Sequence, residues 1–372
     1  MKRKQPFKPY ELPIFSCENP RLSSVEKLKL MDQVVEAMTL MERFKNKLES
    51  SHIKDAVMFV FSLNESIQST KIEGTQATFD EYLESQTAGK YNEDTQEVKN
   101  YLEALKEGAD MLETFPISTR MFLELHKLIL RDSRGKNKAP GMYRKTQNWI
   151  GGSSTKIEDA TYIPPEAQYI DKYMSNLEKY INNEISDELH PLIKVGIIHA
   201  QFESIHPFLD GNGRIGRILI ILYLIKENII KKPNFFVSEE LERNKYKYYA
   251  LLNNLRNETP KWYEWLSFFL DSIIKQTEKY LGKLEQIENL RTSLDIYKAD
   301  DRVVYYVFQN PVFQVKDIVN YFSQLDDKKY HISYGTAKKN VQILVDNQKL
   351  FHNEKKRNRI YRFYELLDIL QK

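Results

Sequence analysis

Residues 206–217, HPFLDGNGRIGR, bring together side chains that suit the transfer of a phosphate-containing group. His206 has an ordinary pKa that suits a general base near neutral pH. Asp210 is a hard oxygen ligand of the kind that Mg²⁺ takes where it bridges phosphates. Arg214 and Arg217 are spaced i, i+3, so we expect both to project from one side of a helical turn, where they could fork onto phosphate oxygens.

A glycine-rich turn separates this histidine from a hydrophobic segment, RIGRILIILYLIKENI, that reads as a buried helix. The first N–H groups of a helix lack internal partners and carry the positive end of its dipole. Gly211, Gly213 and Gly216 allow close backbone approach, so the turn is suited to binding an anion. A His-Pro pair or a Gly-Asn-Gly turn alone is most often only a helix boundary. Their joint occurrence at fixed spacing favours a binding site.

The segment HPFLDGNGRIGR resembles the signature of the Fic family, His-Pro-Phe-x-(Asp/Glu)-Gly-Asn-Gly-Arg-x-x-Arg, and matches every specified position. The resemblance implies an all-helical core and a protein adenylyltransferase, which transfers AMP from ATP to a protein hydroxyl. By position, it implies that His206 deprotonates the target Ser, Thr or Tyr, that Asp210 holds Mg²⁺ and that Phe208 is a buried anchor. It implies that ATP is bound by Asp210, Gly211, Asn212, Gly213, Arg214, Ile215, Gly216 and Arg217. The related Doc branch, which transfers phosphate, lacks the Gly-Asn-Gly-Arg stretch, so the resemblance favours nucleotidyl transfer.

A second stretch, SLNESIQSTKIEGTQATFDEYLE at residues 62–84, predicts a helix that ends at Gly74, because glycine commonly follows a helix C-terminus. Glu73 near that end is mildly unfavourable with the helix dipole. In Fic proteins the pattern (Ser/Thr)-x-x-x-Glu-(Gly/Asn) marks an inhibitory helix, and Ser69, Glu73 and Gly74 match it. The resemblance implies that Glu73 pairs with Arg217, displaces the γ-phosphate and makes the chain self-inhibited.

Residues 140–165, PGMYRKTQNWIGGSSTKIEDATYIPP, predict a β-hairpin, because apolar and polar residues alternate on both sides of a Gly/Ser/Asp-rich centre. An isolated hairpin has exposed edge groups that can pair with another chain. The resemblance implies that this hairpin, residues 147–163, is the flap on which the protein substrate docks as an added strand. The flap residues expected near the nucleotide are Ile150, Gly151, Gly152 and Ser153. We expect Tyr143 and Arg144 to serve packing.

Residues 243–256, RNKYKYYALLNNLR, predict a helix that carries Tyr248 and Tyr249. Aromatic residues on a helix most often belong to the core. The Fic family places a Tyr-Tyr pair in this helix beside the adenine, so the resemblance implies that both tyrosines contact ATP.

Helical periodicity predicts a mainly α fold with the hairpin as its exception. Residues 1–113 form an N-terminal helical extension, 114–275 the Fic catalytic core, 276–290 a linker helix and 291–372 a further domain. Ser23 and Glu26 are placed for a capping box at the first helix. The predicted helices are 23–50, 54–69, 76–86, 94–113, 118–131, 166–182, 187–205, the helix after the glycine-rich turn, 243–256 and 260–290.

Residues 291–372 follow the order helix, strand, helix, helix and then two strands around a basic turn, which predicts a winged-helix (α+β) domain. This region has 15 Lys and Arg against 10 Asp and Glu, with Lys355, Lys356, Arg357 and Arg359 at the turn. DNA binding would need a basic recognition helix together with phosphate contacts. Because the charge excess is modest, a protein–protein or dimerisation module is the favoured alternative, and a homodimer is possible.

The composition is that of an ordinary globular protein, with 41% hydrophobic and 29% charged residues and a net charge of +3. Cys17 is the only cysteine, which excludes an internal disulfide framework and fits a reducing compartment. The basic opening is followed by no apolar run, so no secretory signal is expected. The longest apolar stretch, residues 218–225, is too short to span a membrane, and we expect a cytoplasmic protein.

Three functions are compatible with these patterns. The first is a self-inhibited protein adenylyltransferase that uses ATP and Mg²⁺. The second is a DNA-binding winged-helix regulator whose Fic core responds to ATP; the intact motif from His206 to Arg217 argues against it. The third uses the same site to remove AMP from a modified protein, with Glu73 orienting a water molecule.

Overall fold

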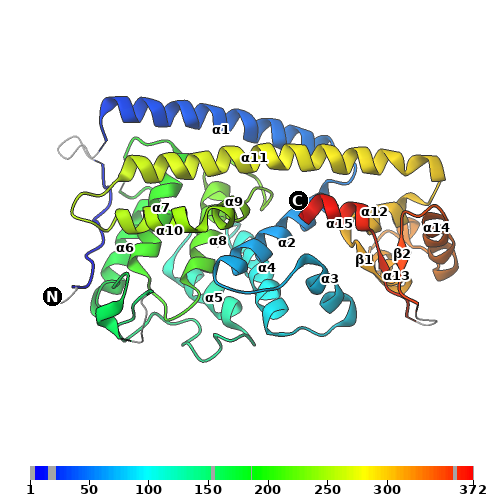
Figure 1. Ribbon diagram of the computed structural model, residues 1–372, viewed down its shortest axis with the longest axis horizontal. Helices are drawn as coiled ribbons and strands as arrows, with labels where there is room; N and C mark the ends of the chain where they lie inside the picture. The colour runs from blue at the N-terminus through cyan, green and yellow to red at the C-terminus, as the bar shows by residue number, and fades with distance from the viewer. Residues whose placement is uncertain (1–4, 16–21, 152–155, 186, 355–357, 372) are drawn as a thin grey trace.

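Two long helices lie side by side along one edge of the molecule (Figure 1): α1 (Ser24–Ser50) and α11 (Trp262–Ser293). The computed structural model describes residues 5–15, 22–151, 156–185, 187–354 and 358–371. The predicted capping box starts α1: the Ser23 hydroxyl accepts a hydrogen bond from the Glu26 N–H, and the Glu26 carboxylate accepts one from the Ser23 N–H at 2.7 Å.

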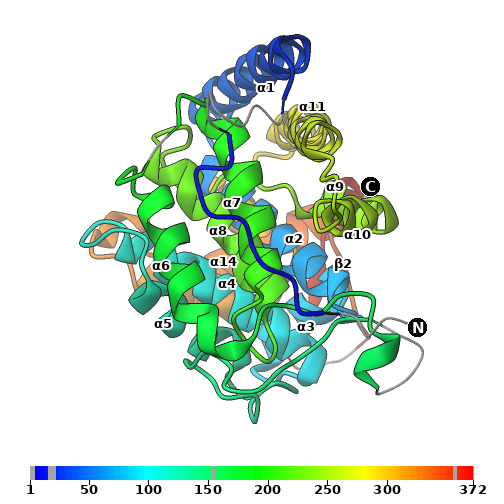
Figure 2. The same cartoon turned by 90° about the vertical axis from the view of Figure 1, so that its left-hand side faces the viewer.

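The other helices of the first 260 residues pack beneath this pair, and their ends differ from the predicted ones by a few residues. They are α2 (Lys54–Ile72), α3 (Phe79–Ala88), α4 (Glu93–Met111), α5 (Thr119–Leu130), α6 (Ile170–Ile181), α7 (Pro191–Ile205), α8 (Asn212–Lys226), α9 (Ser238–Arg243) and α10 (Lys245–Asn254). Figure 2 shows α7 and α8 near the centre of this assembly, with α1 and α11 above them.

The two central helices are buried on all sides, as a helix that is apolar all round must be. Residues 192–205 of α7 and 212–224 of α8 are buried throughout. Because the polar turn of residues 206–211 joins these two helices, it is held at both ends by the most rigid part of the core.

The predicted helix over residues 243–256 corresponds to α10, which begins after Asn244, and the short α9 that ends at Arg243 was not predicted. The Asn244 side chain donates hydrogen bonds to the Glu240 backbone oxygen at 3.0 Å and to its carboxylate at 2.7 Å. These bonds hold the end of α9, and α10 begins with the next residue.

The regular hairpin predicted for residues 140–165 is not formed in the described part of this segment, so that prediction is wrong as to secondary structure. One isolated antiparallel bridge joins Ile150 to Tyr162. Two polar side chains of the first arm donate to backbone oxygens. Gln147 donates to the Pro164 oxygen of the second arm at 2.9 Å, and Asn148 donates to the Phe208 oxygen of the motif turn at 3.2 Å. The two arms of the segment therefore pair with each other only around Ile150 and Tyr162, and Asn148 also ties the first arm to the motif turn.

Residues 301–371 form a small α/β unit at the far end of α11 (Figure 1). Its strands form a three-stranded antiparallel sheet in the order β1-β3-β2, in which Arg362 faces Val312 and Phe351. Its elements are α12 (Asp301–Gln309), β1 (Val312–Phe313), α13 (Val315–Ser323), α14 (Tyr334–Asp346), β2 (Phe351–His352), β3 (Tyr361–Arg362) and α15 (Tyr364–Gln371).

The order of these elements follows the predicted one, except that α15 was not expected. The Lys283 ammonium of α11 donates to the Leu370 oxygen of α15 at 2.9 Å, which ties the end of the chain to the long helix. The predicted boundary at residue 275 falls inside α11, which continues without a break through residues 276–290. Lys355, Lys356 and Arg357 lie outside the described residues.

Among the described helices, none has the length and apolar character needed to cross a membrane.

We expect Phe61→Ala to lower the free energy of unfolding by about 3–5 kcal/mol, because the ring joins three helices. Phe61 of α2 is buried and stacks on Tyr280 of α11 at 4.4 Å, and it lies 6.2 Å from Phe44 of α1. Chemical denaturation followed by circular dichroism measures the change. Met31→Ala, at an exposed position on α1, is the control and should cost less than about 0.5 kcal/mol. Equal losses for the two variants would contradict this account of the packing.

Candidate active site

The turn between α7 and α8 is held in shape by its own side chains. His206 ends α7 in the left-handed conformation, with φ of 49°. The Phe208 ring is fully buried and stacks on His126 at 3.8 Å, which is the anchor position implied by the resemblance. The Asn212 amide accepts from the Phe208 N–H at 2.8 Å and donates to the Phe208 oxygen at 2.9 Å. The side chain of Asn212 therefore braces the turn.

His206 lies in an environment that keeps its imidazole neutral. Burial lowers the pKa of His206 to about 3, and the guanidinium groups of Arg256 and Arg144 add to this effect. Arg144 also holds the backbone of the motif turn. Its side-chain Nε donates to the His206 oxygen at 2.9 Å, and its backbone N–H donates to the Pro207 oxygen at 2.9 Å. At neutral pH one ring nitrogen of His206 is therefore unprotonated and can accept a hydrogen bond.

The N-terminus of α8 lies against a carboxylate. Gly211 precedes the helix with φ of +80° and has no side chain that could cap it. The first N–H groups of α8 are therefore available to an acceptor from elsewhere. A Cβ at Gly213 would lie 2.1 Å from Oε1 of Glu73, so only glycine admits the carboxylate there. Glu73 thus occupies the position where the helix dipole favours negative charge.

The same carboxylate pairs with Arg217, which is 1% exposed. The Arg217 Nη2 donates to Glu73 Oε1 at 2.7 Å and to the Ser69 backbone oxygen at 2.9 Å, and Nε donates to the Ser69 hydroxyl at 2.7 Å. Ser69 and Glu73 are four residues apart and so share one face of α2. Gly74 follows with φ of +100°. The structure therefore brings the three residues of the expected inhibitory pattern to the second arginine of the motif.

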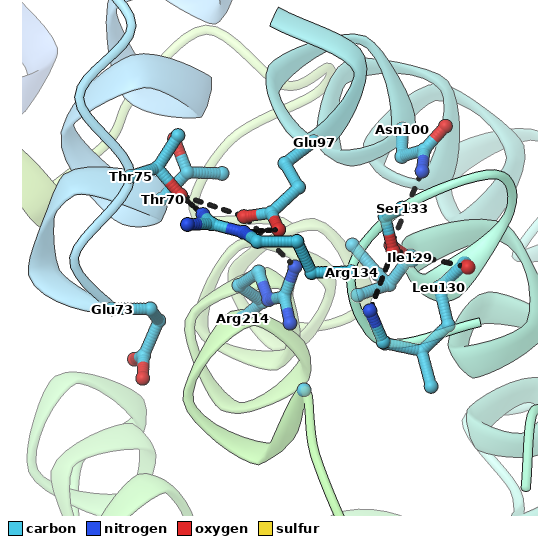
Figure 3. A network of polar contacts seen from close by, with 12 residues as sticks. Thr70, Glu73, Thr75, Glu97, Asn100, Ile129, Leu130, Ser133, Arg134 and Arg214 are labelled. Atoms are coloured by element: carbon cyan, nitrogen blue, oxygen red, sulfur yellow. Dashed lines mark hydrogen bonds and ion pairs between the residues drawn. The ribbon is translucent and has the colours of Figure 1, made fainter. Parts of the chain in front are cut away.

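Arg214 points toward Glu97 of α4 (Figure 3). Its Nη2 donates to Asp210 Oδ1 at 3.1 Å, and its Nη1 lies 3.5 Å from Oε2 of Glu97. Arg214 and Arg217 keep their i, i+3 spacing within α8, but their guanidinium groups pair with different carboxylates: Arg214 with Asp210 and Glu97, and Arg217 with Glu73. Between them, Ile215 is buried in the core, and Gly216 faces the Glu203 carboxylate of α7.

Asp210 is the one carboxylate within the motif, and its side chain is 39% exposed. The described residues contain no cluster of three or more His, Cys, Asp or Glu side chains that could hold a metal ion alone. Mg²⁺ commonly binds through one or two carboxylates, with phosphate oxygens and water completing its shell. A single accessible carboxylate beside an anion site fits that mode of binding.

A cavity of about 510 Å³ lies between His206, Arg217 and the Glu73 carboxylate. Some motif residues expected to bind ATP are not among the residues that line it: Asp210, Gly211, Asn212, Arg214, Ile215 and Gly216. Tyr248 forms part of its wall: the ring is fully buried and the hydroxyl lies 2.8 Å from Nε2 of His199. Tyr249 is 38% exposed, so it can present its ring to a ligand. The expected site residues that line this cavity are Glu73, Gly74, Ile150, Gly151, His206, Gly213, Arg217, Tyr248 and Tyr249. Gly152 and Ser153 lie outside the described residues.

Glu203 and Arg256 are among the cavity-wall residues that were not singled out from the sequence, and both lie close to His206. Oε2 of Glu203 lies 3.9 Å from Nδ1 of His206, and burial raises the pKa of Glu203 to about 7. Glu203 is the only acid in the otherwise mainly apolar α7, which is a signal that sequence analysis could have used. Arg256 donates to the Glu203 backbone oxygen at 3.0 Å and covers the Tyr162 ring at 3.5 Å. No motif or periodicity distinguishes Arg256.

We expect Glu203→Gln to be more stable relative to the wild type at pH 8 than at pH 5, by on the order of 2 kcal/mol. A carboxyl whose pKa is raised on folding binds more protons in the folded state, so its stabilising contribution is lost as the pH rises from about 4.5 to about 7. Glutamine removes this titration. Urea unfolding at several pH values measures the difference, and a difference that does not depend on pH would contradict the assignment.

Two family models match the chain, and the matched segments together include about half of it. The model described as Fic/DOC family matches residues 116–224, and Fic/DOC family N-terminal matches residues 31–110. A curated relative, the protein adenylyltransferase Fic of Drosophila willistoni, is 26% identical over 268 residues, which is 72% of this chain and 48% of the relative. The chain thus spans about half the length of the curated relatives that it matches.

Solved structures show the same fold. A Fic family protein from Desulfovibrio desulfuricans has a TM-score of 0.56 at 18% identity, over 97% of this chain and 98% of that one. Fic-1 from C. elegans, residues 134–508, has a TM-score of 0.51 at 18% identity, over 68% of this chain and 74% of that one. With its motif turn, its two matched segments and this fold, the chain belongs to the Fic/DOC family.

Proposed function

We propose that this protein is an adenylyltransferase that transfers AMP from ATP to a Ser, Thr or Tyr hydroxyl of a protein. One observation carries the proposal: a single cavity joins a neutral His206 to Gly213 at the N-terminus of α8 and to Arg217. A general base and an anion site are the two requirements of this reaction. The names of the curated relatives support the same class of activity.

The reaction follows from what each group can do. His206 takes the proton of the target hydroxyl on Nε2, because its Nδ1 faces Glu203. The hydroxyl oxygen forms a bond to the α-phosphorus, and the bond from that phosphorus to the bridging oxygen breaks. Pyrophosphate then leaves with the bonding electrons. The N–H groups at the start of α8 stabilise the added charge on the phosphate oxygens.

Asp210 would hold Mg²⁺, which neutralises phosphate charge when it is bound.

The protein substrate would dock on the segment of residues 147–163, where Ile150 and Tyr162 form the isolated bridge. We also propose that residues 291–372 form a winged-helix domain. In this proposal the domain binds a protein, which includes a second copy of this chain, rather than DNA.

We further propose that Glu73 inhibits the enzyme. Its carboxylate occupies the anion position at Gly213 and neutralises Arg217, so a nucleotide phosphate must displace it from both. The pair is charge-assisted, and the arginine is almost completely buried, so the inhibited arrangement is favoured until another anion takes its place.

We expect Glu73→Gly to incorporate AMP into itself at least about tenfold faster than the wild type, because the competing carboxylate is gone. The intact mass of the protein after incubation with Mg²⁺-ATP measures this, and one AMP should be added. The double variant Glu73→Gly/His206→Ala should gain no mass. Equal gains in the single and double variants would exclude His206 as the base.

We expect Asp210→Asn, made in the Glu73→Gly protein, to need at least about tenfold more Mg²⁺ for half-maximal AMP transfer. The loss of one carboxylate charge removes the protein's own ligand in this proposal. Titration of Mg²⁺ at saturating ATP measures the change. Asp271→Asn, at a surface pair on α11, is the matched control and should leave the Mg²⁺ requirement unchanged.

A second reaction is favoured by the position of Glu73. Its side chain is 34% exposed and lines the same cavity as His206, so its carboxylate could orient a water molecule that removes AMP from a modified protein. If no variant gains mass while ATP still binds, release of AMP from a modified substrate is the reaction to measure, and Glu73→Gly should then be slower than the wild type.

A further inference from the structure

Glu97 of α4 is a buried carboxylate that joins three segments of the chain (Figure 3). Its side chain is 5% exposed. Oε1 accepts a hydrogen bond from Nε of Arg134 at 2.9 Å, and Oε2 accepts one from the Thr75 hydroxyl at 2.6 Å. The same Oε2 lies 3.5 Å from Nη1 of Arg214. Glu97 thus connects three side chains: Arg134, which follows α5; Thr75, which follows the proposed inhibitory helix; and Arg214, the first arginine of the motif.

Arg214 depends on this carboxylate for much of its charge balance. Its side chain is 4% exposed, and its Nε and Nη1 atoms are buried without a hydrogen-bond partner among the described residues. Asp210 supplies one hydrogen bond, and Glu97 supplies the nearest carboxylate on the other side. A buried guanidinium that loses a carboxylate partner is strongly destabilised, so the position of Arg214 follows that of Glu97.

Glu97 is charged at neutral pH. Burial by itself raises the pKa of a carboxyl, but the hydrogen bond from Arg134 and the charge of Arg214 outweigh it and hold the pKa of Glu97 below its usual value.

Thr75 connects this cluster to the proposed inhibitory helix. It lies two residues after Glu73, it is 1% exposed, and its N–H donates to the Thr70 oxygen of α2 at 3.2 Å. Its hydroxyl bonds the one oxygen of Glu97 that is nearest to Arg214. A displacement of the end of α2 must therefore break the Thr75–Glu97 bond.

We propose that Glu97 is a positioning residue for Arg214, and that the Thr75 hydroxyl couples the end of α2 to this carboxylate. While Thr75 is bound, it holds the end of α2 in place and shares Oε2 with Arg214. When the end of α2 moves away, Oε2 is left to Arg214 alone, and the arginine is set to face the nucleotide phosphates. This inference rests on the proposed adenylyl transfer.

The first test is Glu97→Gln in the Glu73→Gly protein, with self-modification measured by intact mass at several ATP concentrations. We expect the KM for ATP to rise about tenfold with a smaller change in kcat, because Arg214 loses its position rather than its chemistry. Glu103→Gln is the matched control: it lies on the same helix and removes the same charge, but it pairs with Arg131 at the surface. A KM equal to that of the Glu73→Gly protein would overturn the role of Glu97.

The second test keeps Glu73 and changes only the coupling. Thr75→Val should raise self-modification about tenfold over the wild type, because a hydrogen bond to a charged group is lost. Thr75→Ser should restore the wild-type rate. Thr70→Val is the control, since the Thr70 hydroxyl bonds only backbone oxygens of its own helix in the described contacts. A rate for Thr75→Val equal to the wild type would overturn the coupling.

These results can be separated from a failure of the proposed function. If the Glu73→Gly protein itself gains no AMP, adenylyl transfer is wrong for this chain. If it gains AMP, the KM of the Glu97→Gln variant and the rate of the Thr75→Val variant test the inference by themselves. Thermal unfolding shows whether each variant is folded, and Thr75→Val decides the matter if Glu97→Gln is not.

Discussion

The buried guanidinium of Arg217 is the constraint on which the rest of the site depends. It lies in α8, which is enclosed by other helices, so its charge must be balanced from within the core. Glu73 and Ser69 supply that balance from α2. The last turn of α2 must therefore pack directly over the start of α8, and this places a carboxylate at the helix N-terminus. A phosphate would satisfy the same arginine and the same N–H groups, which is the basis of the proposed inhibition by Glu73.

The titratable groups around this pair have pKa values that are shifted in different directions. His206 is held neutral by burial and by the nearby Arg256 and Arg144, which suits a group that must accept a proton. Glu203 is close to it, and burial raises the pKa of this carboxyl, so His206 faces a carboxyl with a reduced tendency to carry charge. Glu97, equally buried, stays charged because Arg134 and Arg214 adjoin it. Hydrogen bonds separate these two acids: Arg134 and Thr75 donate to the Glu97 carboxylate, whereas Arg217 and Arg256 act on the Glu203 carboxyl only through their charge.

The carboxylates also explain why the two arginines of the motif diverge. Regular spacing places Arg214 and Arg217 near one another along α8, yet Arg214 pairs with Glu97 of α4 and Arg217 with Glu73 at the end of α2. Each guanidinium turns to its own partner. The first arginine then reaches Asp210, and the second reaches the cavity with His206.

The sequence by itself determined the local features: the helices, the capping box at Ser23, the motif turn between two apolar helices and its resemblance to the Fic signature. These depend on periodicity and spacing within short segments, which a single sequence displays. Through the resemblance it also indicated the contact between Glu73 and Arg217. Tertiary structure alone decided that Glu203, Arg256 and Glu97 join the site and that residues 140–165 bond to the motif turn instead of forming a ladder. These contacts join residues far apart in the chain, and which polar groups meet there depends on how the helices pack, since each buried charge and backbone group must find a partner.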